Sequence, residues 1–233
     1  LSAALWAAHH ELKQLSAGGL THALEKLRFP QLFAASVLTI VSYLLLTTYD
    51  LLGVRYARIR ASAPYVMLVS FIAYAMTNNI GFGTVTGTST RFRFYTRAGA
   101  STTDAVRVMA FCGTTFWLGY TMLAGWALLT GEAAHLGRLS FLAPIAPAVG
   151  IGLEVVVAGY ILICFVWRGS ITFRGERFSP PAPWAAVLQP LLGAADWILA
   201  SSVFYVLLPH GAHLSYTAFL HAFLLAQMAG MLS

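Results

Sequence analysis

Charged side chains are scarce in this chain, and acidic ones most of all. Only 9% of its 233 residues are charged, and just 8 are Asp or Glu. A soluble domain carries about 25% charged residues, so the composition excludes an ordinary water-soluble protein. Hydrophobic residues make up 58% of the chain, which predicts a protein that crosses a membrane several times.

Patterns for catalysis or metal binding are missing as well. Cys112 and Cys164, the only two cysteines, lie in apolar stretches, where a free thiol acts as a small hydrophobic side chain. The sequence HHELKQ at 9–14 lacks the second histidine of an HExxH zinc motif, and GFGTVTG at 81–87 lacks the flanks of a nucleotide-binding loop. We therefore predict no catalytic site, metal or cofactor in this segment.

The net charge of +6 comes from 14 lysines and arginines, most of them in short loops. In a membrane protein such cations are explained by the preference for positive charge on the cytoplasmic side and by anionic lipid head groups. We therefore expect phospholipids as partners, and no direct binding of nucleic acid by this segment.

Apolar stretches separated by short polar loops predict an all-α integral membrane protein, a polytopic helical bundle. Residues 1–29 are typical of an interfacial amphipathic segment, and 30–233 form the transmembrane domain. Asp104 is expected to cap the helix after it, and the basic loop 168–183 can form a small hairpin. The expected spans are about Gln31–Leu52, Ala105–Leu129, Ala143–Trp167, Trp184–Leu208 and Leu214–Leu232.

One segment, at about 65–95, does not resemble an ordinary span. Its apolar run Tyr65–Met76 has only 12 residues, whereas a spanning helix needs about 20. Asn78, Asn79 and several glycines follow, and irregular backbone at membrane depth persists only inside protein or beside a water-filled cavity. The count of cytoplasmic cations is the same whether this segment re-enters or crosses. The short run favours a re-entrant broken helix with a polar site inside and arginines at its mouth.

Three of the 8 acidic residues fall within expected spans: Asp50, Glu154 and Asp196. A charged side chain at the centre of a membrane helix costs about 2.5–3.5 kcal/mol on insertion scales, so each marks a candidate polar path. Plainer interpretations stay open. Asp50 can pair locally with an arginine or act at a helix end, and Glu154 and Asp196 can bond to polar side chains of neighbouring helices.

Arg91 and Arg93, which follow the helix break, are candidate phosphate ligands. A planar guanidinium suits phosphate because it can donate two parallel hydrogen bonds. The alternative is that these arginines fix the topology, with long side chains that reach the interface. Asn78 and Asn79 can cap the broken helix or offer their amides to a ligand.

Five blocks of the sequence recur in the same order in a known family of membrane proteins. The most specific are the Tyr-Asp…Arg-Tyr block and the Asn-Asn-Ile-Gly…Arg-x-Arg-x-Tyr block. The blocks are SYLLLTTYDLLGVRY (42–56), SFIAYAMTNNIGFGTVTGTSTRFRFYTRAG (70–99), FCGTTFWLG (111–119), GAADWILASSVFYVLLP (193–209) and SYTAFLHAFLLAQMAGMLS (215–233). Over nearly its whole length the chain thus resembles the membrane domain of the multiple peptide resistance factor family, bacterial lysylphosphatidylglycerol synthase/flippases.

In that family the membrane domain moves aminoacylated phosphatidylglycerol to the outer leaflet of the bacterial cytoplasmic membrane. This transfer lowers surface negative charge and gives resistance to cationic antimicrobial peptides. The resemblance implies a multi-pass lipid flippase domain, incomplete at both ends, whose partners are lysyl-phosphatidylglycerol, phosphatidylglycerol and a C-terminal cytosolic synthase domain. A homodimer is a further expected assembly. The parent protein would be an aminoacyl-tRNA-dependent phosphatidylglycerol lysyltransferase.

The implied lipid carries a phosphate and two amines on its head group, which assigns a role to each candidate residue. The expected path has Arg91 and Arg93 on the phosphate, Asp50, Glu154 and Asp196 on the amines, and Asn78 and Asn79 as neutral hydrogen-bonding groups.

Two other functions stay open: a membrane anchor that feeds lipid to the lysyltransferase without transport, and a transporter of another lipid or a solute.

Overall fold

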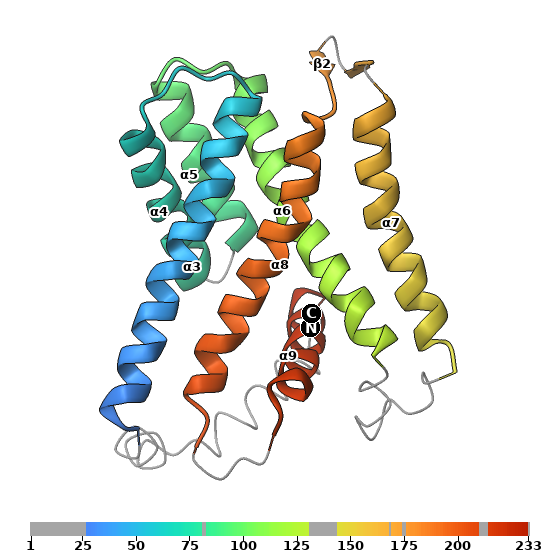
Figure 1. Ribbon diagram of the computed structural model, residues 1–233. Coiled ribbons are helices and arrows are strands. Elements are labelled where there is room, and N and C mark those ends of the chain that lie inside the picture. The colour runs from blue at the N-terminus through green and yellow to red at the C-terminus, as the bar shows by residue number, and fades with distance from the viewer. Residues whose placement is uncertain are drawn as a thin grey trace. The chain divides into compact units, whose positions relative to one another are not determined.

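The computed structural model describes residues 27–80, 83–130, 144–167, 169–173, 176–209 and 214–232. The predicted interfacial segment 1–29 lies almost wholly outside them. Within the described residues the chain forms seven helices and one two-stranded hairpin (Figure 1). The helices are α3 (Phe29–Tyr56), α4 (Ala63–Ile80), α5 (Gly83–Arg97), α6 (Thr102–Leu129), α7 (Ala146–Val166), α8 (Pro183–Val206) and α9 (Tyr216–Leu232), and the strands are β1 (Ile171–Phe173) and β2 (Glu176–Phe178).

Four of the described helices, α3, α6, α7 and α8, are long and apolar enough to cross a membrane. The shortest of them, α7, has 21 residues, and such a helix is about 32 Å long, close to the thickness of a bilayer core. Protein covers little of some of these helices: 11% of the apolar window of α3 and 17% of that of α7 is buried. Apolar surface on that scale is unfavourable in water, so the structure confirms an all-α polytopic membrane protein.

Observed helix ends agree with the expected spans to within a few residues. α3 continues past Leu52 to Tyr56, and α8 contains Pro190 in its interior. The last expected span forms α9, whose 17 residues make it shorter than the four long helices. The small hairpin in the basic loop is present, with β1 and β2 antiparallel and Ile171 opposite Phe178.

The start of α6 corrects one predicted detail, the identity of the capping residue. Ser101 is the N-cap, because its Oγ accepts a hydrogen bond from the Asp104 backbone N–H at 3.1 Å. The Asp104 carboxylate accepts bonds in turn from the Ser101 hydroxyl and from Arg107 Nη1, both at 2.7 Å. The helix begins one turn before its apolar run, so Asp104 lies inside the first turn. There its negative charge interacts favourably with the partial positive charge of the helix N-terminus.

The predicted re-entrant segment is confirmed as a helical hairpin of α4 and α5. α4 starts and α5 ends at the same end of the structure as the end of α3 and the start of α6 (Figure 1). α5 has 15 residues, and a helix of that size is about 22 Å long, shorter than a bilayer core of about 30 Å. The Tyr65 hydroxyl donates to the Phe94 carbonyl at 2.8 Å and so joins the start of α4 to the end of α5.

The chain divides into two compact units, and the division falls within α3 and α8. In the smaller unit, Gln31 Nε2 donates to the Val206 carbonyl at 2.9 Å. The Tyr216 hydroxyl of α9 lies 2.9 Å from the Ser201 hydroxyl of α8. These bonds hold the first turns of α3, the last turns of α8 and α9 together within that unit. The units are Leu1–Thr39 with Leu199–Ser233, and Ile40–Ile198.

In the larger unit, α6 packs against α8 and α7 through glycines. Gly119 of α6 faces Gly193 of α8, and a Cβ added to Gly193 would lie 2.8 Å from the Gly119 Cα. A Cβ added to Gly150 of α7 would lie 2.9 Å from the Gly125 carbonyl oxygen of α6. Small residues allow membrane helices this close approach, and close packing replaces the hydrophobic drive that lipid cannot supply.

Candidate functional site

The α4–α5 hairpin, α3 and α6 enclose a small core, and close contacts join α5 to α4 and α3 to α6. Gly87 of α5 has no side chain, and a Cβ there would collide with the Thr77 hydroxyl of α4. Gly53 of α3 meets α6, where an added Cβ would lie 3.1 Å from Val108 Cγ1. The core residues around this contact are buried and apolar: Val54, Val66, Val69, Ala105 and Val108. Polar groups inside this core therefore have protein neighbours in place of water.

Asp50 of α3 lies inside this core and is 0% exposed. Its Oδ1 accepts hydrogen bonds from Arg91 Nε at 2.8 Å and from the Tyr95 hydroxyl at 2.9 Å. Its Oδ2 accepts from Arg91 Nη2 and from the Ser70 hydroxyl, both at 2.9 Å. Each carboxylate oxygen thus has two donors, and Arg91 binds through two bonds, the strong geometry for an arginine and a carboxylate.

Arg91 is as deeply enclosed as its partner and is only 7% exposed. Its guanidinium carbon lies 4.3 Å from the centroid of the Tyr74 ring of α4, a distance typical of a cation–π interaction. This burial corrects the expectation that Arg91 lies at the mouth of the hairpin. The pair joins α5 of the hairpin to α3. Removing one partner would leave an uncompensated buried charge and would cost about 3–5 kcal/mol.

The structure thus brings together two of the seven predicted site residues, Asp50 and Arg91. The partner of Asp50 stands 41 positions away in the sequence and is not one of the arginines of the adjacent loop. Arg93 is exposed on α5. Asn78 and Asn79 lie in the last turn of α4, and their side chains fall outside what the structure describes.

The two remaining predicted acids lie elsewhere in the larger unit. Glu154 of α7 is half-buried against α6, and a Cβ added to Gly125 would lie 2.6 Å from Glu154 Oε1. Asp196 of α8 is 8% exposed and accepts a hydrogen bond from the Ser42 hydroxyl of α3 at 3.3 Å. The buried Tyr49 hydroxyl of α3 has no hydrogen-bond partner among the described residues. The Asp196 carboxylate has one long hydrogen bond from a described residue, whereas that of Asp50 has four.

A buried amide that the sequence prediction missed joins three helices. Gln189 of α8 is 0% exposed, and its Oε1 accepts a short hydrogen bond from the Tyr160 hydroxyl of α7. Its Nε2 donates to Thr115 Oγ1 at 3.0 Å and to the Phe111 carbonyl at 3.3 Å, both in α6. The prediction took its candidate site residues within the long spans from the acids alone and did not consider a neutral amide there. The signal was a lone glutamine beside Pro190 in an apolar helix, because an amide there needs partners on other helices.

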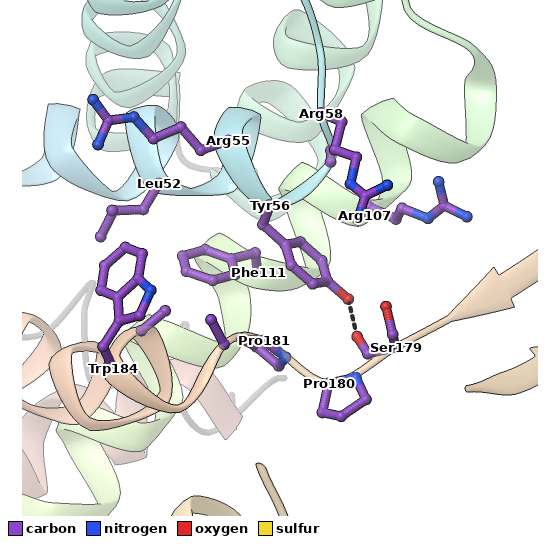
Figure 2. A pocket seen from close by; sticks show the side chains of 13 residues that line it. Leu52, Arg55, Tyr56, Arg58, Arg107, Phe111, Ser179, Pro180, Pro181 and Trp184 are labelled. Carbon is purple, nitrogen blue, oxygen red and sulfur yellow. Dashed lines mark hydrogen bonds between the residues drawn. The ribbon is translucent and has the colours of Figure 1, made fainter. Parts of the chain in front are cut away.

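A pocket of about 450 Å³ lies in the larger unit, where α3 ends and α8 begins (Figure 2). Its 13 lining residues include Arg55, Arg58 and Arg107 and no acid. The sequence prediction explained these three arginines by membrane topology and by anionic lipid head groups in general, and assigned them no site. The pocket is formed by segments far apart in the sequence, so no local pattern could have revealed it.

The re-entrant hairpin, its buried ion pair and the lipid-facing helices define a polytopic helical membrane protein with a polar site inside its membrane domain. No protein-family model matches the chain. An uncharacterized protein of Synechocystis sp. is 32% identical to it over 209 residues, which cover 87% of this chain and 63% of the relative. The inner membrane protein YbhN of Escherichia coli is 32% identical over 203 residues, which cover 86% of this chain and 63% of that protein. The chain therefore spans less than two thirds of each of these relatives.

Proposed function

We propose that this chain is a lipid-translocating domain that moves aminoacylated phosphatidylglycerol, such as lysyl-phosphatidylglycerol, from the inner to the outer leaflet of a bacterial cytoplasmic membrane. The observation that carries the proposal is the Asp50–Arg91 ion pair, buried between a re-entrant hairpin and a long helix. Ionisable side chains in membrane segments mark substrate paths, and broken helices build transporter sites. The sequence resemblance described above supplies the identity of the lipid. Similarity to an inner membrane protein supports the location.

The ion pair suits a head group that carries both signs of charge. A phosphate can take the place of Asp50 on the Arg91 guanidinium, because both groups present two oxygens to the same planar fork. An amine of the lipid can take the place of Arg91 on Asp50. Such an exchange keeps every buried charge paired, and it avoids the large cost of an isolated ion in a medium of low dielectric constant.

Asp196 is the proposed contact for the second amine of the head group. An ionised carboxylate can accept about four hydrogen bonds, and the one from the Ser42 hydroxyl is long, at 3.3 Å. An amine that enters beside Asp196 would supply further donors to this carboxylate. Glu154, Arg93, Asn78 and Asn79 stay predicted contacts along the same path.

The test is translocation of lysyl-phosphatidylglycerol by the full-length protein in proteoliposomes. An amine-reactive reagent that cannot cross the membrane labels only outer-leaflet lipid, so transport raises the labelled fraction with time. Asp50→Asn and Asp196→Asn should reduce this rise to that of protein-free vesicles. Ser70→Ala is the matched control, because it removes one donor to Asp50 and changes no charge.

Each variant must first be shown to be folded, by its elution in detergent and its thermal unfolding. Normal translocation by both asparagine variants would mean that the site is assigned wrongly. A folded wild-type protein that moves no lipid would favour the anchoring role. Uptake of a water-soluble substrate would favour a solute transporter.

A further inference from the structure

The pocket at the end of α3 is lined by cationic and apolar side chains (Figure 2). In that view the Tyr56 hydroxyl and the guanidinium groups of Arg58 and Arg107 lie toward one end, and Leu52, Trp184 and the Arg55 guanidinium lie toward the other. The volume of about 450 Å³ falls within the range of small-molecule sites, roughly 300–1,000 Å³. A ligand that fits this pocket combines an anion with an apolar part.

The positive charge of the pocket is only partly neutralised by protein. Arg107 pairs with Asp104, which does not line the pocket, at 2.7 Å. Among the described residues, neither Arg55 nor Arg58 forms an ion pair, and both are exposed. Cations at this helix end also interact favourably with the partial negative charge of the α3 C-terminus, and they help to set the membrane topology. That explanation requires positive charge only near the helix end, and it does not require a lined cavity.

The backbone at Arg58 is a second, independent observation. Arg58 has φ 58°, in the left-handed region that is strained for a residue with a Cβ. Its N–H donates to the Arg55 carbonyl and the Ile59 N–H donates to the Val54 carbonyl, both at 3.1 Å. This is the Schellman pattern that ends many helices, usually with glycine in the strained position. Strain of this kind is often kept where a side chain has a function, and glycine would supply no guanidinium here.

The aromatic residues of the pocket indicate at which level of the membrane it lies. Trp184, at the start of α8, is 58% exposed, and tryptophan at the end of a membrane helix lies at the level of the lipid head groups. The Tyr56 hydroxyl donates to the Ser179 carbonyl at 2.6 Å and holds the end of α3 beside the segment that leads into α8. A pocket at that level meets lipid phosphates more readily than soluble anions.

We propose that this pocket binds the phosphodiester group of an anionic membrane phospholipid. Arg58 and Arg107 hold the phosphate, and Trp184 and Leu52 pack against the glycerol and the first acyl carbons. Guanidinium groups match phosphate in shape and charge. Arg55, whose guanidinium lies on the side of Leu52 and Trp184, adds further positive charge to the pocket (Figure 2). This binding site is separate from the Asp50–Arg91 pair and does not require that the chain translocates lipid.

Native mass spectrometry of the full chain in a neutral detergent tests the proposal. Phosphatidylglycerol and phosphatidylcholine are offered in equal amounts, and the wild type should retain phosphatidylglycerol preferentially. Arg58→Gln should lower this retention about five-fold, the effect of one cation near a membrane surface. Arg60→Gln is the matched control, because it removes the same charge from the same loop and Arg60 does not line this pocket.

Equal losses in the Arg58 and Arg60 variants would show a diffuse effect of surface charge and would overturn the proposal. Glycerol phosphate, which has no acyl chains, is added as a competitor to distinguish the two sources of phosphate. Displacement of the lipid at equal concentration would assign the site to a soluble phosphate compound and overturn the lipid assignment. If Arg58→Gln does not fold, Arg58→Gly replaces it, because glycine suits the backbone at that position. If the folded Arg58→Gly variant retains as much phosphatidylglycerol as the wild type, the proposal is also overturned.

Discussion

Neutralising Asp50 should loosen the hairpin and leave Arg91 as a buried charge without its partner. Asparagine keeps one acceptor oxygen, so two of the four hydrogen bonds to this side chain are lost. The Tyr74 ring, whose centroid lies 4.3 Å from the guanidinium carbon, remains beside Arg91. This contact offsets about 0.5–2 kcal/mol of the cost of leaving the charge unpaired. Breaking a buried ion pair costs about 3–5 kcal/mol, so we expect the free energy of unfolding of Asp50→Asn to fall by that amount.

The double variant Asp50→Asn/Arg91→Met should recover most of this loss. It contains no charge at either position, and replacing a buried ion pair by neutral side chains of similar volume is often close to neutral in stability. Because each single variant leaves one buried charge unpaired and the double variant leaves none, the coupling free energy between the two positions should exceed about 3 kcal/mol. Translocation should stay absent in this stable variant, because nothing remains to exchange with the head group.

Unfolding by sodium dodecyl sulfate in mixed micelles, followed by circular dichroism, measures stability for the wild type, both single variants and the double variant. Ser70→Ala should cost only about 1 kcal/mol, as expected for one hydrogen bond. The reasoning is refuted if the double variant loses as much as the two single variants combined. Translocation by the stable double variant would separate the ion pair from transport.

Three further substitutions test the packing, the buried amide and the strained turn. Gly87→Ala forces the hairpin apart and should lower the free energy of unfolding, measured by thermal unfolding, by about 1–3 kcal/mol. Its control Gly113→Ala has open space around the added Cβ and should raise the free energy of unfolding by up to about 1 kcal/mol. Equal effects of the two substitutions would contradict the close approach of α4 and α5. Gln189→Leu leaves the Tyr160 hydroxyl without its acceptor and should cost about 1–3 kcal/mol. Adding Tyr160→Phe should restore most of that loss, and no recovery would count against the bond. Arg58→Gly relieves the left-handed backbone and should raise the free energy of unfolding by about 1 kcal/mol; a lower unfolding midpoint would exclude strain there.

The positions of the helices were predictable because lipid is the solvent for every long helix. A spanning helix must be apolar over its whole length, and this leaves a continuous signal in the sequence. Length alone also distinguished the hairpin, since the run Tyr65–Met76 is too short to cross. The exact cap of α6 was not predictable, because Ser101, Thr102, Thr103 and Asp104 all have side chains that can cap a helix.

The pairing inside the core could not be read from the sequence. Asp50 and Arg91 are 41 positions apart, and each had several candidate partners of opposite charge. The choice depends on how α5 packs in the folded protein, where the missing side chain of Gly87 lets α5 approach α4 closely and Arg91 lies beside Tyr74 and Asp50. An arginine placed by its neighbours in the sequence belongs at the mouth of the hairpin, but the packing turns it inward.

The cationic pocket was hidden for a different reason. An arginine that fixes topology and one that lines a pocket have the same place in the sequence, at the end of an apolar helix. What distinguishes them is the segment that packs beside α3: the Tyr56 hydroxyl bonds to Ser179, 123 positions later. The positive φ of Arg58 is likewise a property of the folded turn.

The contact between Gly119 and Gly193 restricts how this protein can diverge. An added methyl at either position would overlap the backbone of the other helix, and the partner glycine has no side chain that a second substitution could shorten. Neither position can therefore compensate for a change in the other. Descendants that keep this crossing of α6 and α8 are held to glycine at both positions, whatever lipid their polar residues come to select.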